Sequence, residues 1–167
     1  MKFVSALVLI LCAALFMGVA VHDHQQLPAR IASHFDANGA ADGWSSKSSF
    51  LFLMVTVGIG IPSLLSALLY AVRFLPAKFL NVPNPEYWRK PENYRKACDF
   101  LLVSSWWFGS AFLLWQTAFS RMIVAANQVS PPHLDSSRVV LLSVPLLLFS
   151  LGWAALIVLR FSKIPEA

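Results

Sequence analysis

Histidine and aspartate, the side chains of this sequence best suited to metal or acid–base chemistry, stand close together in one polar stretch. His22 and His24 flank Asp23, and His34 precedes Asp36 by two positions. Imidazole and carboxylate together are a ligand set that suits zinc or copper. His22 and His24 lack the i,i+4 spacing that places two ligands on one helix face, and nothing in the spacing brings them to His34. These histidines are therefore weak metal candidates, and we expect neither a metal nor another cofactor.

Apolar stretches dominate the rest of the chain, which has 167 residues, of which 57% are hydrophobic and 13% charged. Soluble domains carry roughly a quarter charged residues. Four uncharged stretches are each 19 to 25 residues long, enough to cross a hydrocarbon core of about 30 Å as helices. They are residues 3–21, 48–72, 100–120 and 139–159. Because backbone amides in lipid need partners within their own segment, we predict an all-α membrane protein, a four-transmembrane-helix bundle that forms one domain over residues 1–167.

The distribution of lysine and arginine predicts how these spans are oriented. The first apolar run is longer than the roughly 7 to 15 residues of a secretory signal, so we expect it to be retained as a span. With the N-terminus inside, nine of the thirteen basic residues lie on the cytoplasmic side, which agrees with the positive-inside rule. We therefore expect both termini in the cytoplasm, outer loops over residues 22–47 and 121–138, and an inner loop over residues 73–99.

The positions of the titratable residues exclude several classes of function. All four histidines, His22, His24, His34 and His133, fall in the predicted outer loops. Haem ligation or a proton relay needs such groups inside the spans. The isoelectric point of about 9.6 reflects a basic inner side that faces anionic lipid, so we expect no nucleic-acid partner. Cys12 and Cys98 lie at different depths and are not expected to form a disulfide.

The polar stretch begins with the spacing of a helix. Leu27, Ile31 and Phe35 recur every four residues, and Pro28 suits the first position of a helix. We therefore predict a short interfacial helix from Leu27 to Phe35.

Two turn dipeptides follow this predicted helix. They are Asn38-Gly39 and Asp42-Gly43, whose residue types tolerate positive φ. Asp36 can also accept a hydrogen bond from the backbone two residues on. We predict two successive turns, after which Trp44 anchors the chain at the lipid headgroups.

Two motifs resemble a bacterial family. The first reads Leu27-Pro28…Ile31…His34-Phe35-Asp36…Gly39…Asp42-Gly43-Trp44…Lys47, and it is similar to the domain of unknown function that precedes the immunity segment in SdpI proteins. The second, NVPNPEYWRKPE over residues 81–92, resembles a segment of small stand-alone members of that family. The outer motif supplies the candidate ligand- or partner-binding residues Pro28, His34, Asp36, Asn38, Gly39, Asp42, Gly43, Trp44 and Lys47.

The resemblance implies a multi-pass protein of the bacterial cytoplasmic (inner) membrane. SdpI proteins protect the cell from a secreted peptide toxin, and one holds a transcriptional repressor at the membrane. The chain ends after the fourth predicted span, so we expect the separate immunity segment to be missing. The family assigns no catalytic residues, and none is carried over to this chain.

The predicted inner loop combines prolines, aromatic rings and basic residues. Asn84 can cap a helical turn that has Pro85 first and Glu86 next, and Pro91 followed by Glu92 suits the start of the helix that becomes the third span. One interpretation is an interfacial helix with its aromatic side toward lipid. The other is a docking surface for a cytoplasmic partner, formed by Asn84, Tyr87, Trp88, Arg89, Pro91 and Glu92.

Small and polar residues indicate where the spans are expected to touch. They form a stripe on the third span (Ser105, Gly109, Gln116, Ser120), another on the second (Gly58, Pro62, Ser66) and a pair on the first (Ala14, Gly18). We expect the tryptophans of the third and fourth spans, Trp106, Trp107, Trp115 and Trp153, to lie mainly on lipid-facing sides.

Two classes of non-enzymatic function fit these features. In the first, the outer loop meets a secreted peptide and the inner loop signals to a regulator, as the SdpI resemblance implies. In the second, the chain is a small accessory subunit of a larger membrane complex. We expect the lipid bilayer and either another membrane protein or a second copy of this chain as partners. An enzyme that uses the outer histidines and aspartates is a third alternative.

Overall fold

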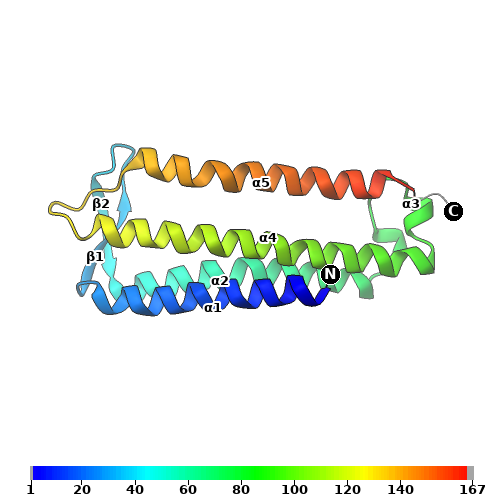
Figure 1. Ribbon diagram of the computed structural model, residues 1–167, viewed down its shortest axis with the longest axis horizontal. Coiled ribbons are helices and arrows are strands. Elements are labelled where there is room, and N and C mark those ends of the chain that lie inside the picture. Colours follow the sequence, from blue (N-terminus) through cyan, green and yellow to red (C-terminus); the bar gives the residue numbers. More distant parts are fainter. Residues whose placement is uncertain (1, 165–167) are drawn as a thin grey trace.

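The computed structural model describes residues 2–164, in which four long helices lie side by side along one axis (Figure 1). They are α1 (Lys2–Gln26), α2 (Lys47–Ala71), α4 (Pro91–Ala126) and α5 (Ser136–Ser162). All four are long and apolar enough to cross a membrane. This arrangement confirms the predicted all-α, four-helix membrane fold.

Short elements close the two ends of the bundle. The strands β1 (Arg30–Phe35) and β2 (Ala41–Ser46) join α1 to α2, and we call this side the hairpin end. The opposite side, which we call the α3 end, joins α2 to α4 through η1 (Val72–Phe74), η2 (Ala77–Phe79) and α3 (Pro85–Trp88).

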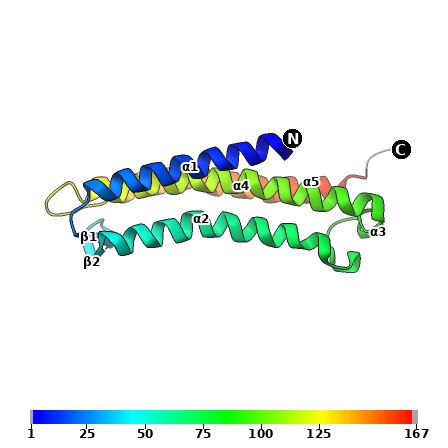
Figure 2. The ribbon, with the colours of Figure 1, turned by 90° about the horizontal axis from the view of Figure 1, so that it is seen from below.

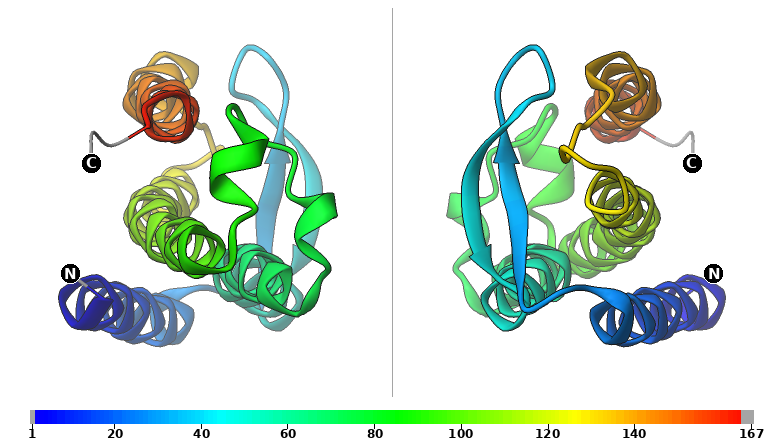
Figure 3. Two further views of the ribbon diagram at one scale, coloured as in Figure 1. Left: turned by 90° about the vertical axis from the view of Figure 1, so that its right-hand side faces the viewer. Right: turned by 90° about the vertical axis from the view of Figure 1, so that its left-hand side faces the viewer.

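Helix α4 is the centre of the bundle. The end views place it between α5 on one side and the α1–α2 pair on the other (Figure 3), and in the view from below α1 and α2 run on either side of it (Figure 2). In its most apolar window 61% of the residues of α4 are buried, whereas none is buried in that of α5. Helix α5 therefore meets the rest of the protein along one narrow face.

The polar stripe of α4 faces the other helices, as the sequence predicts. Ser105, Gly109, Gln116 and Ser120 are all buried. The Gln116 amide donates a hydrogen bond to the Met54 sulfur at 3.2 Å. A Cβ added at Gly109 would lie only 3.0 Å from the Cβ of Pro62. Small residues therefore allow the close approach of α4 to α2.

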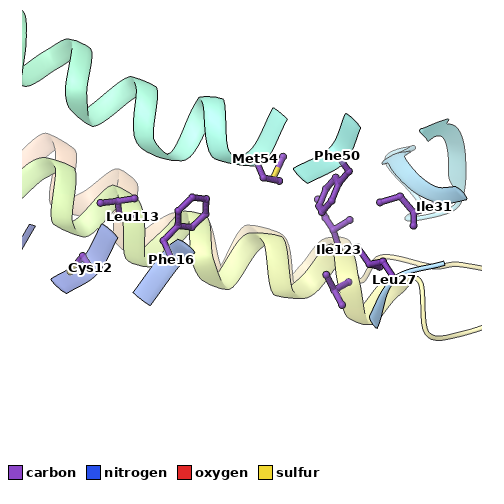
Figure 4. Close-up of a cluster of buried hydrophobic side chains, with 9 residues drawn as sticks. Cys12, Phe16, Leu27, Ile31, Phe50, Met54, Leu113 and Ile123 are labelled. Carbon is purple, nitrogen blue, oxygen red and sulfur yellow. The ribbon is translucent and has the colours of Figure 1, made fainter. Parts of the chain in front are cut away.

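The contact between α1 and α2 depends on Gly58, which belongs to the predicted stripe of the second span, and not on the predicted small-residue pair of the first span. Gly58 packs directly on the ring of Phe16, where an added Cβ would lie 2.5 Å from Cζ. Phe16 belongs to the main core, which spans α1, α2, α4 and β1 (Figure 4). The predicted contact at Ala14 and Gly18 is wrong, since both are exposed. Two positions along a helix turn a side chain by about 200°, which places Ala14 opposite the buried face of Phe16.

The predicted helix from Leu27 to Phe35 is wrong, because residues 30–35 form strand β1 instead. A repeat of four residues fits a helix, but it is also two periods of a strand. Leu27 and Ile31 are buried, and Ile31 points toward Phe50 of α2 (Figure 4). The sequence therefore predicted the buried apolar residues correctly, but it predicted a helix where the backbone forms a strand.

The first predicted turn is confirmed and becomes the loop of a β-hairpin. Gly39 N donates to Asp36 O at 2.9 Å, Asp36 N donates to Ala40 O at 2.9 Å, and Gly39 has a φ of +85°. This is the three-residue loop in which a turn is followed by a left-handed residue. As predicted, an Asp36 carboxylate oxygen accepts the backbone N–H of Asn38 at 2.9 Å.

The second predicted turn, at Asp42-Gly43, is wrong, because both residues lie within β2. Gly43 stands opposite His34, beside two register shifts of the hairpin. A Cβ on Gly43 would lie 2.7 Å from the Cβ of His34. The glycine therefore serves a close approach between the strands at an irregular step rather than a change of chain direction.

The start of α4 at Pro91 is confirmed, with Glu92 in its first turn. Asn84 precedes α3 as predicted, but its side chain makes no cap. The amide of Asn84 instead donates to the backbone oxygens of Phe161 and Ser162, at 3.2 and 2.8 Å. Its φ of +52° lies in the left-handed region that asparagine tolerates. Asn84 therefore links the loop to the end of α5.

The tryptophans of α4 and α5 do not all lie on lipid-facing sides. The indole N–H of Trp153 donates to the backbone oxygen of Ser104 at 3.0 Å, and that of Trp115 donates to the Ser143 hydroxyl at 3.4 Å. Both rings are half-buried between α4 and α5, whereas Trp107 is exposed. Two of the four tryptophans thus connect α5 to the bundle, because an indole N–H in hydrocarbon needs an acceptor.

Candidate binding site at the hairpin end

The backbone of the hairpin is fastened to the end of α4 by one side chain. Asn127 Oδ1 accepts the N–H of Ala32 at 2.8 Å, and Asn127 Nδ2 donates to the carbonyl of Ala32 at 2.9 Å. The same amide nitrogen lies 2.9 Å from the carbonyl oxygen of Ile123. Asn127 therefore pairs with β1 as a neighbouring strand would.

The hairpin loop is fastened at a second place, to the segment before α5. Leu134 N donates to Gly39 O at 2.9 Å, and the Ser136 hydroxyl donates to Ala37 O at 3.1 Å. A Cβ on Gly39 would overlap the carbonyl oxygen of Leu134. Gly39 thus has two reasons to be glycine, its positive φ and this contact.

Two side-chain pairs lie on the exposed side of the fastened hairpin. His34 Nδ1 lies 2.5 Å from Asp42 Oδ1, and both side chains are largely exposed. The Arg30 guanidinium lies 5.5 Å from the centre of the Trp44 ring, and Trp44 is 47% exposed. Aromatic rings and arginine are the residues that most often anchor protein interfaces.

An ion pair between a buried carboxylate and a half-exposed arginine lies beneath the hairpin, between α1 and α4. Arg121 Nη1 lies 2.5 Å from Asp23 Oδ1, and only 4% of the Asp23 side chain is exposed. The second carboxylate oxygen of Asp23 is buried and has no hydrogen-bond partner among residues 2–164, and the same is true of His24 Nε2. A buried charge at a membrane boundary is costly unless it is paired, and Arg121 supplies the opposite charge beside the Asp23 carboxylate.

A small cavity of about 10 Å³ lies beside this ion pair, lined by Asp23, His24, Lys47 and Ser120 among others. That volume suits a single water molecule. The position of Lys47 here, at the first residue of α2, separates it from the exposed pairs of the hairpin. The hairpin end therefore has an exposed layer of paired side chains and a buried polar layer below it.

The structure divides the predicted outer residues into groups. His34, Asp42 and Trp44 are exposed on the hairpin; Asp36, Asn38 and Gly39 form its loop. Pro28 is exposed before β1, Gly43 lies within β2, and Lys47 lies at the cavity. The weak metal candidates are not brought together, since the described residues contain no group of three histidine, cysteine, aspartate or glutamate side chains that can hold an ion. His22 instead contacts Gln26, with 2.9 Å between the two nitrogens.

Asp23 and Arg121 were missed as a pair by the sequence analysis. Asp23 follows the first apolar stretch within two residues, and Arg121 directly follows the third. Opposite charges at the same predicted membrane boundary were a signal that could have been used.

Most of the predicted inner docking residues make contacts within the protein itself. Trp88 is 1% exposed, and its indole donates to Phe161 O at 2.9 Å. The Arg89 side chain donates to Leu80 O at 3.1 Å. Placing the Trp88 ring in lipid or against a partner is therefore wrong, since it packs on Phe161 in the second core. Tyr87 is half-buried, and Pro91 and Glu92 are exposed.

The fold and the site together define a multi-pass helical membrane protein with a hairpin cap. The family model described as "Domain of unknown function (DUF1648)" matches residues 9–59. This segment holds most of α1, the whole hairpin and the first half of α2, so it confirms the resemblance to a domain of unknown function. The link to SdpI proteins stays a prediction. Neither a curated protein nor a solved structure matches the chain.

Proposed function

We propose that this chain is a non-enzymatic protein of the bacterial cytoplasmic membrane whose hairpin cap binds a ligand or partner outside the cell, in the manner of SdpI-type immunity and signalling proteins. The observation that carries the proposal is the exposed Arg30–Trp44 and His34–Asp42 layer on a hairpin that is fastened at both its strand and its loop.

Rigidity supports a binding role for this layer. The hairpin uses its backbone for fastening, through Ala32, Ala37 and Gly39. Its exposed side chains are therefore held in place while they remain available for contact with a partner. A surface that is ordered before binding loses less conformational entropy when a partner arrives.

The proposed orientation places the hairpin end outside and the α3 end in the cytoplasm. It rests on the excess of lysine and arginine at the α3 end. The family match over residues 9–59 includes the hairpin but not α4 or α5, which supports the hairpin as the shared functional element.

The test compares three variants with a matched control in the strain that carries this protein. Each variant is expressed in a strain that lacks the native gene, and this strain is grown in culture supernatant of its undeleted parent. Trp44→Ala, His34→Ala and Asp42→Ala are each expected to abolish survival. Val129→Ala is the control, because Val129 is an exposed apolar residue at the same end but outside the hairpin. Membrane insertion of each variant is measured in parallel. Full survival of all three hairpin variants would contradict the proposal.

A second candidate function, an accessory subunit of a larger membrane complex, is favoured by a hollow between α4 and α5. It has a volume of about 410 Å³ and is lined only by apolar and aromatic side chains, among them Leu114, Trp115, Pro145 and Phe149. Such a hollow can receive side chains of a neighbouring helix by close packing. Extraction in mild detergent followed by native mass spectrometry distinguishes the two functions. Larger companions in fixed ratio favour the subunit, and a monomer or homodimer favours the binding cap.

A further inference from the structure

Three basic side chains from three different helices line one hollow at the α3 end. Lys2 begins α1, Arg73 lies in η1 directly after α2, and Arg95 lies in the second turn of α4. The hollow has a volume of about 360 Å³, within the range of about 300 to 1,000 Å³ that is usual for small-molecule sites. It lies at the opposite end of the bundle from the hairpin cap and is independent of it.

The positive charge in this hollow is only partly balanced. Within residues 2–164, Asp99 is the one acidic residue that lines it. Asp99 Oδ2 lies 2.5 Å from Lys2 Nζ, and Asp99 Oδ1 lies 3.7 Å from Arg73 Nη2. Among these described side chains one carboxylate faces three cations, which gives the hollow a net positive charge.

The guanidinium of Arg73 is held in position with donors to spare. Its Nε donates to Tyr70 O at 3.2 Å, and its central carbon lies 4.0 Å from the centre of the Tyr70 ring. Its Nη2 atom is buried and has no hydrogen-bond partner among residues 2–164. A positioned guanidinium with an unsatisfied N–H group is suited to a phosphate oxygen, since guanidinium groups form strong charge-assisted hydrogen bonds to phosphate.

An apolar surface adjoins this charged hollow. Phe74 lines it and is 72% exposed, and the next residue, Leu75, is exposed as well. The hollow also lies where the apolar stretches of α1 and α2 end. A soluble phosphate would not use the adjoining apolar side chains, whereas an acyl chain would cover them.

We propose that the hollow formed by Lys2, Arg73 and Arg95 binds the phosphate group of an anionic phospholipid, with the acyl chains lying beside Phe74. Basic pockets between helices at a membrane boundary are suited to this chemistry. The proposal goes beyond a general attraction of the basic end to the membrane, because it names a site with a fixed arginine.

The test uses the full-length protein, purified in detergent and titrated with phosphatidylglycerol or with phosphatidylcholine of the same chains. Native mass spectrometry measures the lipid that stays bound. Both lipids carry an anionic phosphate, but the trimethylammonium group of phosphatidylcholine is repelled by the net positive charge of the hollow. The wild-type protein is therefore expected to retain phosphatidylglycerol with at least about ten-fold higher affinity than phosphatidylcholine. Equal retention of the two lipids would overturn the proposal.

Variants decide whether this affinity belongs to the hollow. Arg73→Gln is expected to weaken phosphatidylglycerol binding about ten-fold, and Arg73→Lys, which keeps the charge but loses the paired N–H groups, less than Arg73→Gln. Lys96→Gln is the charge-matched control, because Lys96 is exposed and outside the hollow. An equal loss in Arg73→Gln and Lys96→Gln would show a diffuse charge effect and overturn the proposal.

Two further arms keep the test decisive. Arg95→Gln replaces Arg73→Gln if that variant does not fold, because Arg95 is exposed and makes no ion pair within the described part of the chain. Excess inorganic phosphate is expected to leave bound phosphatidylglycerol in place. Full displacement by inorganic phosphate would indicate a site for a soluble anion and overturn the lipid assignment.

Discussion

The hairpin end and the α3 end close the same bundle with different parts of the chain. The hairpin offers its backbone, at Ala32 and Gly39, to Asn127 and Leu134. The loop at the α3 end offers its side chains, since Trp88 and Asn84 reach the last carbonyls of α5. Fastening through the backbone leaves the hairpin side chains free to face water, whereas fastening through side chains buries them.

This difference shows why a cluster of aromatic and basic residues is ambiguous in a sequence. Trp44 and Trp88 both lie among polar and basic residues, yet Trp44 is half exposed and Trp88 is fully buried. An aromatic ring is available to a partner when the backbone of its loop makes the contacts with the bundle, and it is buried when the side chains make them.

The largest expected effect is at the α3 end, where Trp88→Ala removes both a buried ring and a hydrogen bond. Large-to-small substitutions of buried tryptophan cost about 3 to 5 kcal/mol, and we expect a loss of that order in the free energy of unfolding. Far-UV circular dichroism during unfolding in mixed micelles measures it.

Two controls sharpen this result. Trp88→Phe keeps a ring but loses the N–H donor, and it is expected to cost roughly 1 to 2 kcal/mol. Trp107→Ala removes an outward-facing ring and is expected to change stability by less than either substitution at Trp88. A Trp88→Ala protein as stable as Trp107→Ala would show that side chains do not fasten the α3 end.

The next effect concerns the buried layer of the hairpin end. Arg121→Gln leaves the Asp23 carboxylate buried without its charge partner, and we expect a loss of about 2 kcal/mol, less than for a fully buried pair because 53% of the Arg121 side chain is exposed. The double variant with Asp23→Asn is expected to recover most of this loss, because no buried charge then remains. Thermal unfolding of both single variants and the double variant measures the coupling. Additive losses would mean that the two residues do not act as a pair.

A smaller and more local effect is expected for Gly39→Ala. A non-glycine residue with this positive φ costs about 1 to 2 kcal/mol, and the added Cβ meets the carbonyl of Leu134. Faster hydrogen exchange is expected at the Leu134 amide and in the hairpin, but not in α4. Gly60→Ala is the control, since an added Cβ there has no neighbour within 4 Å. Unchanged exchange at the Leu134 amide would show that its contact with Gly39 does not fasten the hairpin loop.

The smallest effect on stability is expected on the exposed face of the hairpin. Trp44→Ala and His34→Ala should each change the free energy of unfolding by only about 0.5 kcal/mol, as is usual for surface side chains. Loss of survival in parental supernatant without loss of stability would separate binding from folding. A loss of stability as large as that of Trp88→Ala would show that side chains fasten the hairpin end as well as the α3 end.

The long helices could be predicted from the sequence because their length and apolarity are set by the membrane. Residues 48–72 differ from α2 by one residue at each end. The third helix is longer than its predicted span, because α4 continues past the apolar stretch to Pro91 and Ala126, where tertiary contacts rather than apolarity support it.

The hairpin could be predicted only in part. The Asn38-Gly39 turn and the apolar face of Leu27, Ile31 and Phe35 were readable, but the repeat of four residues did not decide between helix and strand. The deciding contact comes from Asn127, about a hundred positions away, which completes the hydrogen bonds of Ala32. The pairing of Asp23 with Arg121 across 98 positions was likewise fixed by the packing of α1 on α4.

Helix α5 is attached at both of its ends, to the hairpin loop through Ser136 and to the α3 loop through Phe161. Its 27 residues span roughly 40 Å at about 1.5 Å per residue. A helix held at two points cannot tilt by itself to suit a thinner or thicker bilayer. Mismatch with the surrounding hydrocarbon must therefore be met by thickening or thinning of the lipid, or by tilt of the bundle as one body.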